Sequence, residues 1–127
     1  MRVFKTRTFC RSMKRSGMTD GALRAAVLEM TKGLIDADLG GHVVKKRIAV
    51  TGQGKRGGAR TIVATKLAER WFFIYGFRKN ERANIDKDEL RALQEVAKDL
   101  LGLDDRQLDI ALQAGEIVEV RDGDEKA

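Results

Sequence analysis

The stretch from residue 71 to residue 77, WFFIYGF, is apolar on both of the faces that a β-strand would present. A strand covered on one face alternates apolar and polar residues, so a run of this kind belongs in the middle of a sheet. The run is far shorter than the roughly 18 residues that a membrane-spanning helix needs. It therefore predicts a central strand, and it gives no sign of a membrane span.

Neighbouring segments extend the predicted sheet. Residues 43–50 and 61–67 are rich in β-branched side chains, and short connections join them to the strand at 70–77. This arrangement predicts an antiparallel meander of three strands. At the N-terminus, residues 3–10 alternate as a half-exposed strand does, and we expect this strand at an edge.

Apolar residues three and four positions apart predict helices. There are three such segments: one that Thr19 can cap and Gly33 can end, one over residues 86–101 with Asp86 and Glu89 as a capping pair, and one over residues 105–114. Two short segments remain: a connector or helical turn at 34–39 and an extended tail at 116–120. Together these elements predict a single α+β domain over residues 1–127, frayed from about residue 122.

The formal net charge of +6 is the sum of two unlike halves. Residues 1–82 hold 19 Lys and Arg against 6 Asp and Glu, whereas residues 83–127 hold 6 against 13. A basic body is the electrostatic signature of nucleic-acid binding. The acidic half is either a solvated helical face or a segment that shields or positions the basic site.

Composition and spacing argue against several classes of site. The single cysteine, Cys10, cannot form an internal disulfide, and no N-terminal signal pattern is present, so we expect a reduced, cytoplasmic protein. His42 is the only histidine, and no group of residues has metal-ligand spacing, so we expect no metal and no cofactor. Gly52, Gly54 and Gly57 have the spacing of a dinucleotide fingerprint, but β-rich residues follow them where that motif requires a helix.

A glycine-rich loop at residues 52–60, GQGKRGGAR, is the clearest functional signal. Glycines let the backbone approach an anion closely, and cations accompany them here and after the strand at 70–77. These cations are Lys55, Arg56, Arg60, Lys79 and Arg82. Along that strand Phe73, Tyr75 and Phe77 share a face that leads to Lys79. Rings beside cations suit the stacking of unpaired bases over a bound phosphate backbone.

Residues 54–61, 72–77 and 79–85 carry a resemblance to a known family. In this order they closely resemble the RelE-like toxins of bacterial type II toxin–antitoxin modules, particularly the HigB-related branch. The similarity extends from Thr19 to Val120. It implies a RelE-like α+β fold with a twisted, mainly antiparallel sheet of about four strands and with N-terminal and C-terminal helices packed on it.

The resemblance also implies a function. Toxins of this kind cleave messenger RNA, often on the ribosome, without a metal, and a cognate antitoxin neutralises them. The catalytic residues it implies are Lys55 as candidate base, Arg60 facing the scissile phosphate, and Lys79 and Arg82. The residues expected to bind RNA are Arg47, Arg56, Tyr75, Arg78 and Asn80.

The acid that protonates the leaving group is not assigned by the motifs. Some relatives carry an arginine and then a tyrosine where this chain has Asn80 and Asp86. Either Lys79, Arg82 or Tyr75 takes that role, or the activity is weak. Two other interpretations stay open: a non-catalytic toxin that inhibits DNA gyrase by protein contact, and an inactive basic RNA-binding relative.

Overall fold

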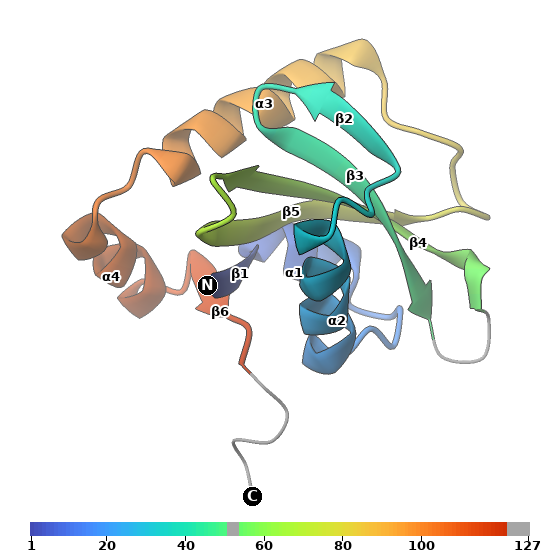
Figure 1. Cartoon of the computed structure of the whole chain (residues 1–127), viewed down its shortest axis with the longest axis horizontal. Helices are drawn as coiled ribbons and strands as arrows, with labels where there is room; N and C mark the ends of the chain where they lie inside the picture. The colour runs from blue at the N-terminus through green and yellow to red at the C-terminus, as the bar shows by residue number, and fades with distance from the viewer. Residues whose placement is uncertain (51–53, 122–127) are drawn as a thin grey trace, which may run out of the picture.

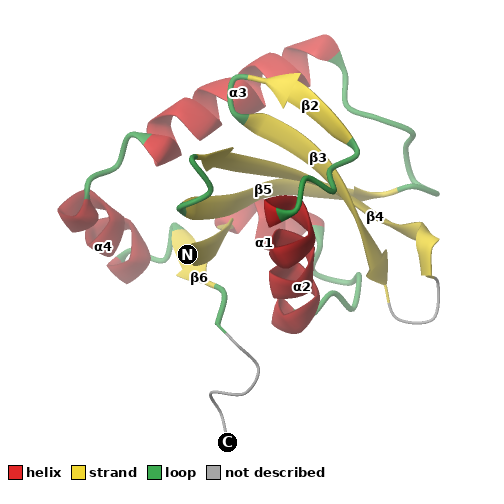
Figure 2. Cartoon of the chain, in the orientation of Figure 1, coloured by secondary structure: helices red, strands yellow, loops and turns green. Residues whose placement is uncertain are grey.

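The computed structural model describes residues 1–50 and 54–121, and over these residues the fold is α+β with a mixed, open sheet of six strands. The strand order is β2-β3-β4-β5-β1-β6 (Figures 1 and 2). The strands are β1 (Arg2–Thr6), β2 (Ala37–Gly40), β3 (Val43–Val50), β4 (Gly54–Lys66), β5 (Arg70–Arg78) and β6 (Ile117–Glu119). The predicted apolar run is β5, and it lies inside the sheet between β4 and β1.

The predicted meander is confirmed, and the sheet is larger than predicted. Strands β2, β3, β4 and β5 pair antiparallel in sequence order, while β1 pairs parallel with β5 and antiparallel with β6. The estimate of about four strands was too low because β2 and β6 come from the segments expected as a connector and a tail. Each is only four or three residues long. Such short strands depend on a partner strand and leave little periodicity in the sequence.

The N-terminal prediction was wrong in two respects. β1 ends at Thr6, and the chain continues as helix α1 (Arg7–Ser12). The Thr6 hydroxyl accepts a hydrogen bond from the backbone N–H of Phe9 at 3.1 Å and so caps this helix. β1 is also not an edge strand, since β6 covers its outer side.

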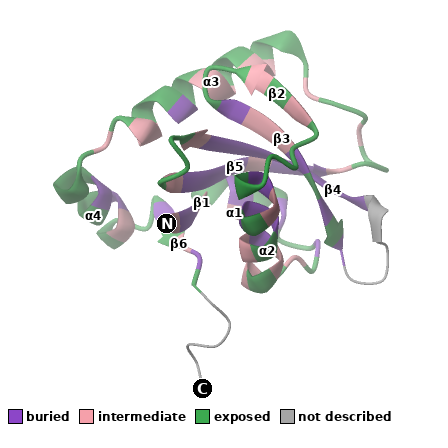
Figure 3. Ribbon diagram, viewed as in Figure 1, coloured by how far each residue is buried: buried purple, intermediate pink, exposed green. Residues whose placement is uncertain are grey.

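Helices pack on both faces of the sheet. α1 and α2 (Asp20–Thr31) share one core with β3, β4 and β5, whereas α3 (Lys87–Leu101) and α4 (Asp105–Gln113) share a second core with the other face. Figure 3 shows burial concentrated in the sheet strands and exposure on the outer sides of the helices. The caps predicted at Thr19 and at Asp86 with Glu89 are both present.

A β-bulge changes which side chains of β5 share a face. Register with β4 shifts between Ile62 and Val63, so Ile62 pairs with Tyr75 and Val63 pairs with Phe73. Phe73 therefore packs in the α1 and α2 core, where its ring lies 5.5 Å from that of Phe9. The predicted row of Phe73, Tyr75 and Phe77 on one face was wrong, because strict alternation fails at the extra residue.

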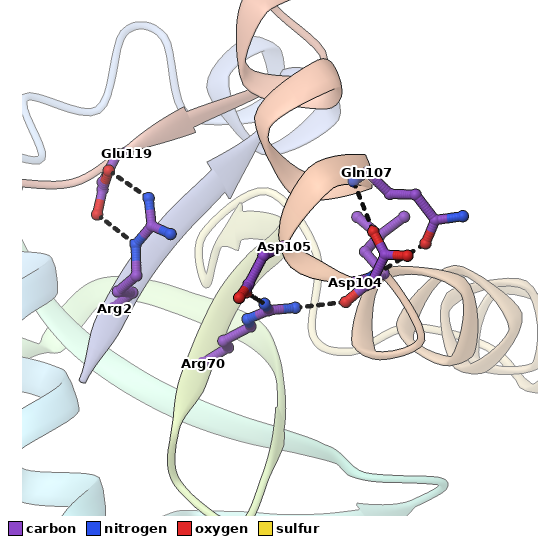
Figure 4. A network of polar contacts seen from close by, with 7 residues as sticks. Arg2, Arg70, Asp104, Asp105, Gln107 and Glu119 are labelled. Carbon is purple, nitrogen blue, oxygen red and sulfur yellow. Dashed lines mark hydrogen bonds and ion pairs between the residues drawn. The ribbon is translucent and has the colours of Figure 1, made fainter.

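The acidic half is fastened to the basic sheet by ion pairs (Figure 4). Arg70 donates to Asp105 at 2.6 Å and to the Leu103 carbonyl at 2.6 Å, which fixes the start of α4 against β5. Arg2 and Glu119 form a bidentate ion pair between β1 and β6, with N···O distances of 2.9 and 3.0 Å. The Arg2 guanidinium also holds the pKa of the Glu119 carboxyl below its ordinary value. Part of the acidic charge thus serves to hold the C-terminal elements in place.

Candidate functional site

Arg60 is the most unusual charged residue of the described structure. It lies in β4, and its side chain and backbone together are only 8% exposed. Its Nη1 atom is buried, and no residue in the ranges 1–50 and 54–121 forms a hydrogen bond with it. A buried charge without a partner destabilises a fold, so such a group calls for a reason other than stability.

The location of Arg60 corrects the sequence interpretation. We expected Arg60 at the end of a solvent-facing loop, but β4 begins at Gly54, so Arg60 is well inside a strand. Its neighbours across the sheet are Arg47 on β3 and Phe77 on β5. The strand is longer than predicted because glycines that suit a loop are also accepted in a paired strand.

Arg47 lies directly opposite Arg60, and its own charge is paired. The Arg47 Nε lies 3.1 Å from Asp36 Oδ1, and the other carboxylate oxygen of Asp36 accepts the backbone N–H of Arg47. The Arg47 side chain is 47% exposed. Like charges opposite each other repel across a sheet. Asp36 offsets that repulsion on the β3 side, and Arg60 has no ion-pair partner in the part of the chain that the structure describes.

Two aromatic rings of β5 lie on the same face as Arg47 and Arg60. The rings of Tyr75 and Phe77 lie 6.2 Å apart and are tilted by 37°. Tyr75 is half-buried and borders a shallow hollow that Glu89, Ala92 and Leu93 of α3 also line. The described structure therefore places two rings beside Arg60 on the α3 face of the sheet.

Arg82 reaches the same face but is held by α3. Its guanidinium contacts both carboxylate oxygens of Glu89, one of them at 2.8 Å, and its Nε donates to the Asn84 carbonyl at 3.0 Å. It also lies 5.7 Å above the Phe77 ring and 3.5 Å from the Tyr75 hydroxyl. This pairing lowers the pKa of Glu89 to about 2 and raises the pKa of Arg82. Arg82 is therefore a fixed and largely neutralised cation.

The remaining predicted site residues are distributed unequally. Lys79 and Asn80 are exposed in the turn after β5, and the Lys79 N–H donates to the Gly58 carbonyl at 3.4 Å. The Arg78 side chain lies on the opposite face of β5 from Phe77, and it lines a hollow on the α1 side of the sheet. The backbones of Lys55 and Arg56 belong to β4, but their side chains lie outside the described part of the structure, as does the predicted frayed tail.

Two residues of this region were missed by the sequence analysis. Glu89 was identified only as the partner of Asp86 in a capping pair, and Asp36 was part of an unassigned connector. Asp36 holds Arg47, and Glu89 holds Arg82. Each of these ion pairs joins two different segments of the fold. The turn at 79–86 places Arg82 within reach of Glu89. No periodic pattern in the sequence predicts the path of such a turn.

The described residues hold no candidate for a metal centre or a membrane span. Over residues 1–50 and 54–121, no three His, Cys, Asp or Glu side chains gather as metal ligands would. None of the helices in these ranges has both the length and the apolar composition needed to cross a membrane.

The fold and this site define a basic α+β protein in which a buried guanidinium, without a partner among the described residues, lies beside two aromatic rings. Comparison with known families agrees with that class: the family model for the RelE toxin of the RelE/RelB toxin–antitoxin system matches residues 1–120. The chain belongs to the RelE toxin family. Membership makes it a toxin of a toxin–antitoxin module and implies a cognate antitoxin as partner. A search of curated proteins found no significant match.

Proposed function

We propose that this protein inhibits translation by cleaving messenger RNA in the cytoplasm, in association with the ribosome and without a cofactor. The observation that carries the proposal is the buried Nη1 of Arg60, which has no partner within the described residues. A fixed donor of this kind costs little reorganisation when negative charge develops beside it. It suits a pentacovalent phosphorus, whose oxygens gain charge in the transition state.

In the proposed reaction the RNA supplies its own nucleophile. The ribose 2′-hydroxyl loses its proton to a base, and its oxygen bonds to the adjacent phosphorus. The bond from phosphorus to the 5′-oxygen then breaks, and an acid protonates that oxygen. The products are a 2′,3′-cyclic phosphate and a 5′-hydroxyl, so atoms and charge balance without a metal or an oxidant.

The residues of the site divide among these roles. Arg60 stabilises the phosphorane. Lys55 is the proposed base, because it lies between other cations in the sequence, and neighbouring positive charge favours the neutral form of a lysine. Tyr75 is the proposed acid, since its hydroxyl lies on the same face and Arg82 holds a donor 3.5 Å away. Arg82 is a positioning residue in this scheme, because Glu89 occupies both of its Nη atoms.

Other cations and polar groups then bind the substrate. Arg47 has half of its side chain exposed beside Arg60 and can contact a neighbouring phosphate. Lys79 and Asn80 are exposed where β5 ends and can hold the next part of the backbone. Arg56 and Arg78 complete the residues that we propose for RNA binding.

Induced expression followed by mapping of the 5′ ends of cellular transcripts tests the proposal. We expect new ends that carry a 5′-hydroxyl, opposite fragments that end in a 2′,3′-cyclic or 3′-phosphate, and neither product from the Arg60→Met protein. With purified protein and free RNA, a chelator should leave cleavage unchanged, and a 2′-deoxy substitution at the cut site should abolish it. Growth arrest with intact transcripts would contradict the proposal and favour inhibition of a protein target such as DNA gyrase.

A further inference from the structure

A second group of cations lies on the opposite face of β5 from Arg60. They surround a polar hollow formed by α1, by the turn that follows it and by the end of β5. Its lining is Arg11, Ser12, Lys14, Arg15, Ser16, Arg78 and Glu81. We name this feature the α1 hollow.

The cations of the α1 hollow are uncompensated. Many other cations of the described structure form ion pairs, as Arg2, Arg70 and Arg82 do. In contrast, none of the four cations that line the hollow makes a side-chain hydrogen bond or ion pair in the described ranges, and Glu81 is the only carboxylate in the lining. Gathering like charges without partners opposes folding and points to an external polyanion.

The hollow is held in place by close packing between α1 and β5. The Ser12 hydroxyl accepts the backbone N–H of Gly76 at 3.2 Å. A Cβ atom on Gly76 would lie 2.5 Å from Met13 Sδ, so α1 approaches the strand as closely as glycine allows. The Ser16 hydroxyl donates to the Met13 carbonyl at 2.8 Å and fixes the following turn. The cations are therefore presented by a packed element.

Chemistry and position identify the ligand class. No aromatic ring lines the hollow, in contrast to the Arg60 side of the sheet with Tyr75 and Phe77. Such a site suits phosphates and has no ring on which a base could stack. Arg78 is the direct neighbour of both Phe77 and Lys79, so a strand of RNA at the Arg60 face can continue around the end of β5 into the hollow.

We propose that the α1 hollow binds the sugar–phosphate backbone of the RNA substrate at a place removed from the cut, and that it contributes affinity. The proposal rests on the function proposed above. It adds Arg11, Lys14 and Arg15 to the RNA-binding residues. Arg11 lies in the last turn of α1, and Lys14 and Arg15 lie in the turn that follows it.

Salt-dependent binding of a fluorescent, uncleavable 2′-O-methyl RNA tests the hollow. The test variant combines Arg11→Gln, Lys14→Gln and Arg15→Gln, all at exposed positions. The control combines Lys32→Gln, Lys66→Gln and Lys98→Gln, which removes the same charge from exposed positions elsewhere. Each phosphate contact contributes about 0.7 to the log–log salt slope for a single strand. We expect the test variant to lose about 2 from the slope and roughly tenfold in affinity near 0.15 M salt, and the control to lose much less.

Each outcome decides the proposal. Equal slopes for the two triple variants, both folded by circular dichroism, would overturn it. So would a test variant that keeps its RNA affinity but no longer co-purifies with the antitoxin, because the hollow would then bind a polypeptide. If the triple variant does not fold, the single change Lys14→Gln should still lower the slope by about 0.7. Because the probe cannot be cut, failure of the cleavage mechanism would leave this comparison intact.

Discussion

Arg47 and Arg60 face each other across β3 and β4, yet within the described structure only Arg47 has a carboxylate partner. Asp36 binds both the side chain and the backbone N–H of Arg47, whereas Nη1 of Arg60 has no partner among the described residues. The pair therefore consists of one cation neutralised by the protein and one left for an external anion. Replacing Arg47 and replacing Arg60 should therefore have different effects on stability and on activity.

Replacing Arg60 should separate activity from stability. In Arg60→Met the cleavage rate should fall by about 10²–10³, the loss typical of removing a preorganised charge stabiliser. The melting temperature should stay the same or rise, because the change removes a buried charge without breaking a hydrogen bond. Single-turnover cleavage and thermal denaturation measure the two effects.

Arg47→Met is the matched control. It removes the guanidinium that pairs with Asp36 but keeps the backbone hydrogen bond, so it should lower the melting temperature slightly and weaken RNA binding more than it slows the reaction at saturating RNA. A folded Arg60→Met protein with full activity would exclude Arg60 from the mechanism.

Tyr75→Phe tests the assignment of the acid. The variant keeps the ring beside Phe77 and loses only the hydroxyl, so cleavage should slow by about 10²-fold, as for removal of a general acid. An RNA whose leaving 5′-oxygen is replaced by sulfur needs little protonation. Tyr75→Phe should cut this substrate at the wild-type rate, whereas Arg60→Met should not. If the sulfur substrate does not rescue Tyr75→Phe, the acid is another group, with Lys79 the next residue to test.

The ion pair between Arg82 and Glu89 predicts a pH dependence of stability. The pKa of Glu89 is lowered from 4.5 to about 2, chiefly because the Arg82 guanidinium hydrogen-bonds its carboxylate. A lowered pKa means that this contribution to stability is complete above about pH 4.5 and is lost as the pH falls toward 2.

Glu89→Gln should therefore reduce the fall in melting temperature between pH 5 and pH 2 while keeping a side chain that can serve in the helix cap. The control is Glu95→Gln on the same helix, which removes an exposed carboxylate that makes no ion pair with the described residues. Identical pH profiles for the Glu89 variant and the wild type would show that the pair is absent in solution.

Gly76→Ala tests the close contact between α1 and β5. The added Cβ would lie 2.5 Å from Met13 Sδ and 3.2 Å from Phe9 Cε1. Overpacking of this kind typically lowers the free energy of unfolding by about 1–3 kcal/mol. Gly21→Ala on α2 is the control, since the added Cβ would lie 3.8 Å from the Thr19 hydroxyl oxygen and a helical alanine is favourable. Chemical denaturation compares them, and equal stabilities would contradict the packing.

Much of the framework could be predicted from local pattern. The apolar run at 71–77 indicated the interior strand β5, and the meander followed from short connections. Thr19, Asp86 and Glu89 marked two helix starts, because capping depends on residues only three positions apart. The motifs at residues 54–61, 72–77 and 79–85 likewise indicated the RelE family, and the family match to residues 1–120 confirms it.

Tertiary structure decided the rest, because those features depend on contacts between distant segments. β2 and β6 are strands only because β3 and β1 offer them free edges, and Thr6 ends β1 by capping α1. The bulge in β5 opposite Ile62 and Val63 placed Tyr75 and Phe73 on different faces. The sequence determined by itself which cations are present. Only the fold determined that Asp36 and Glu89 neutralise two of them while Arg60 stays buried with no partner among the described residues, because pairing depends on distance in space.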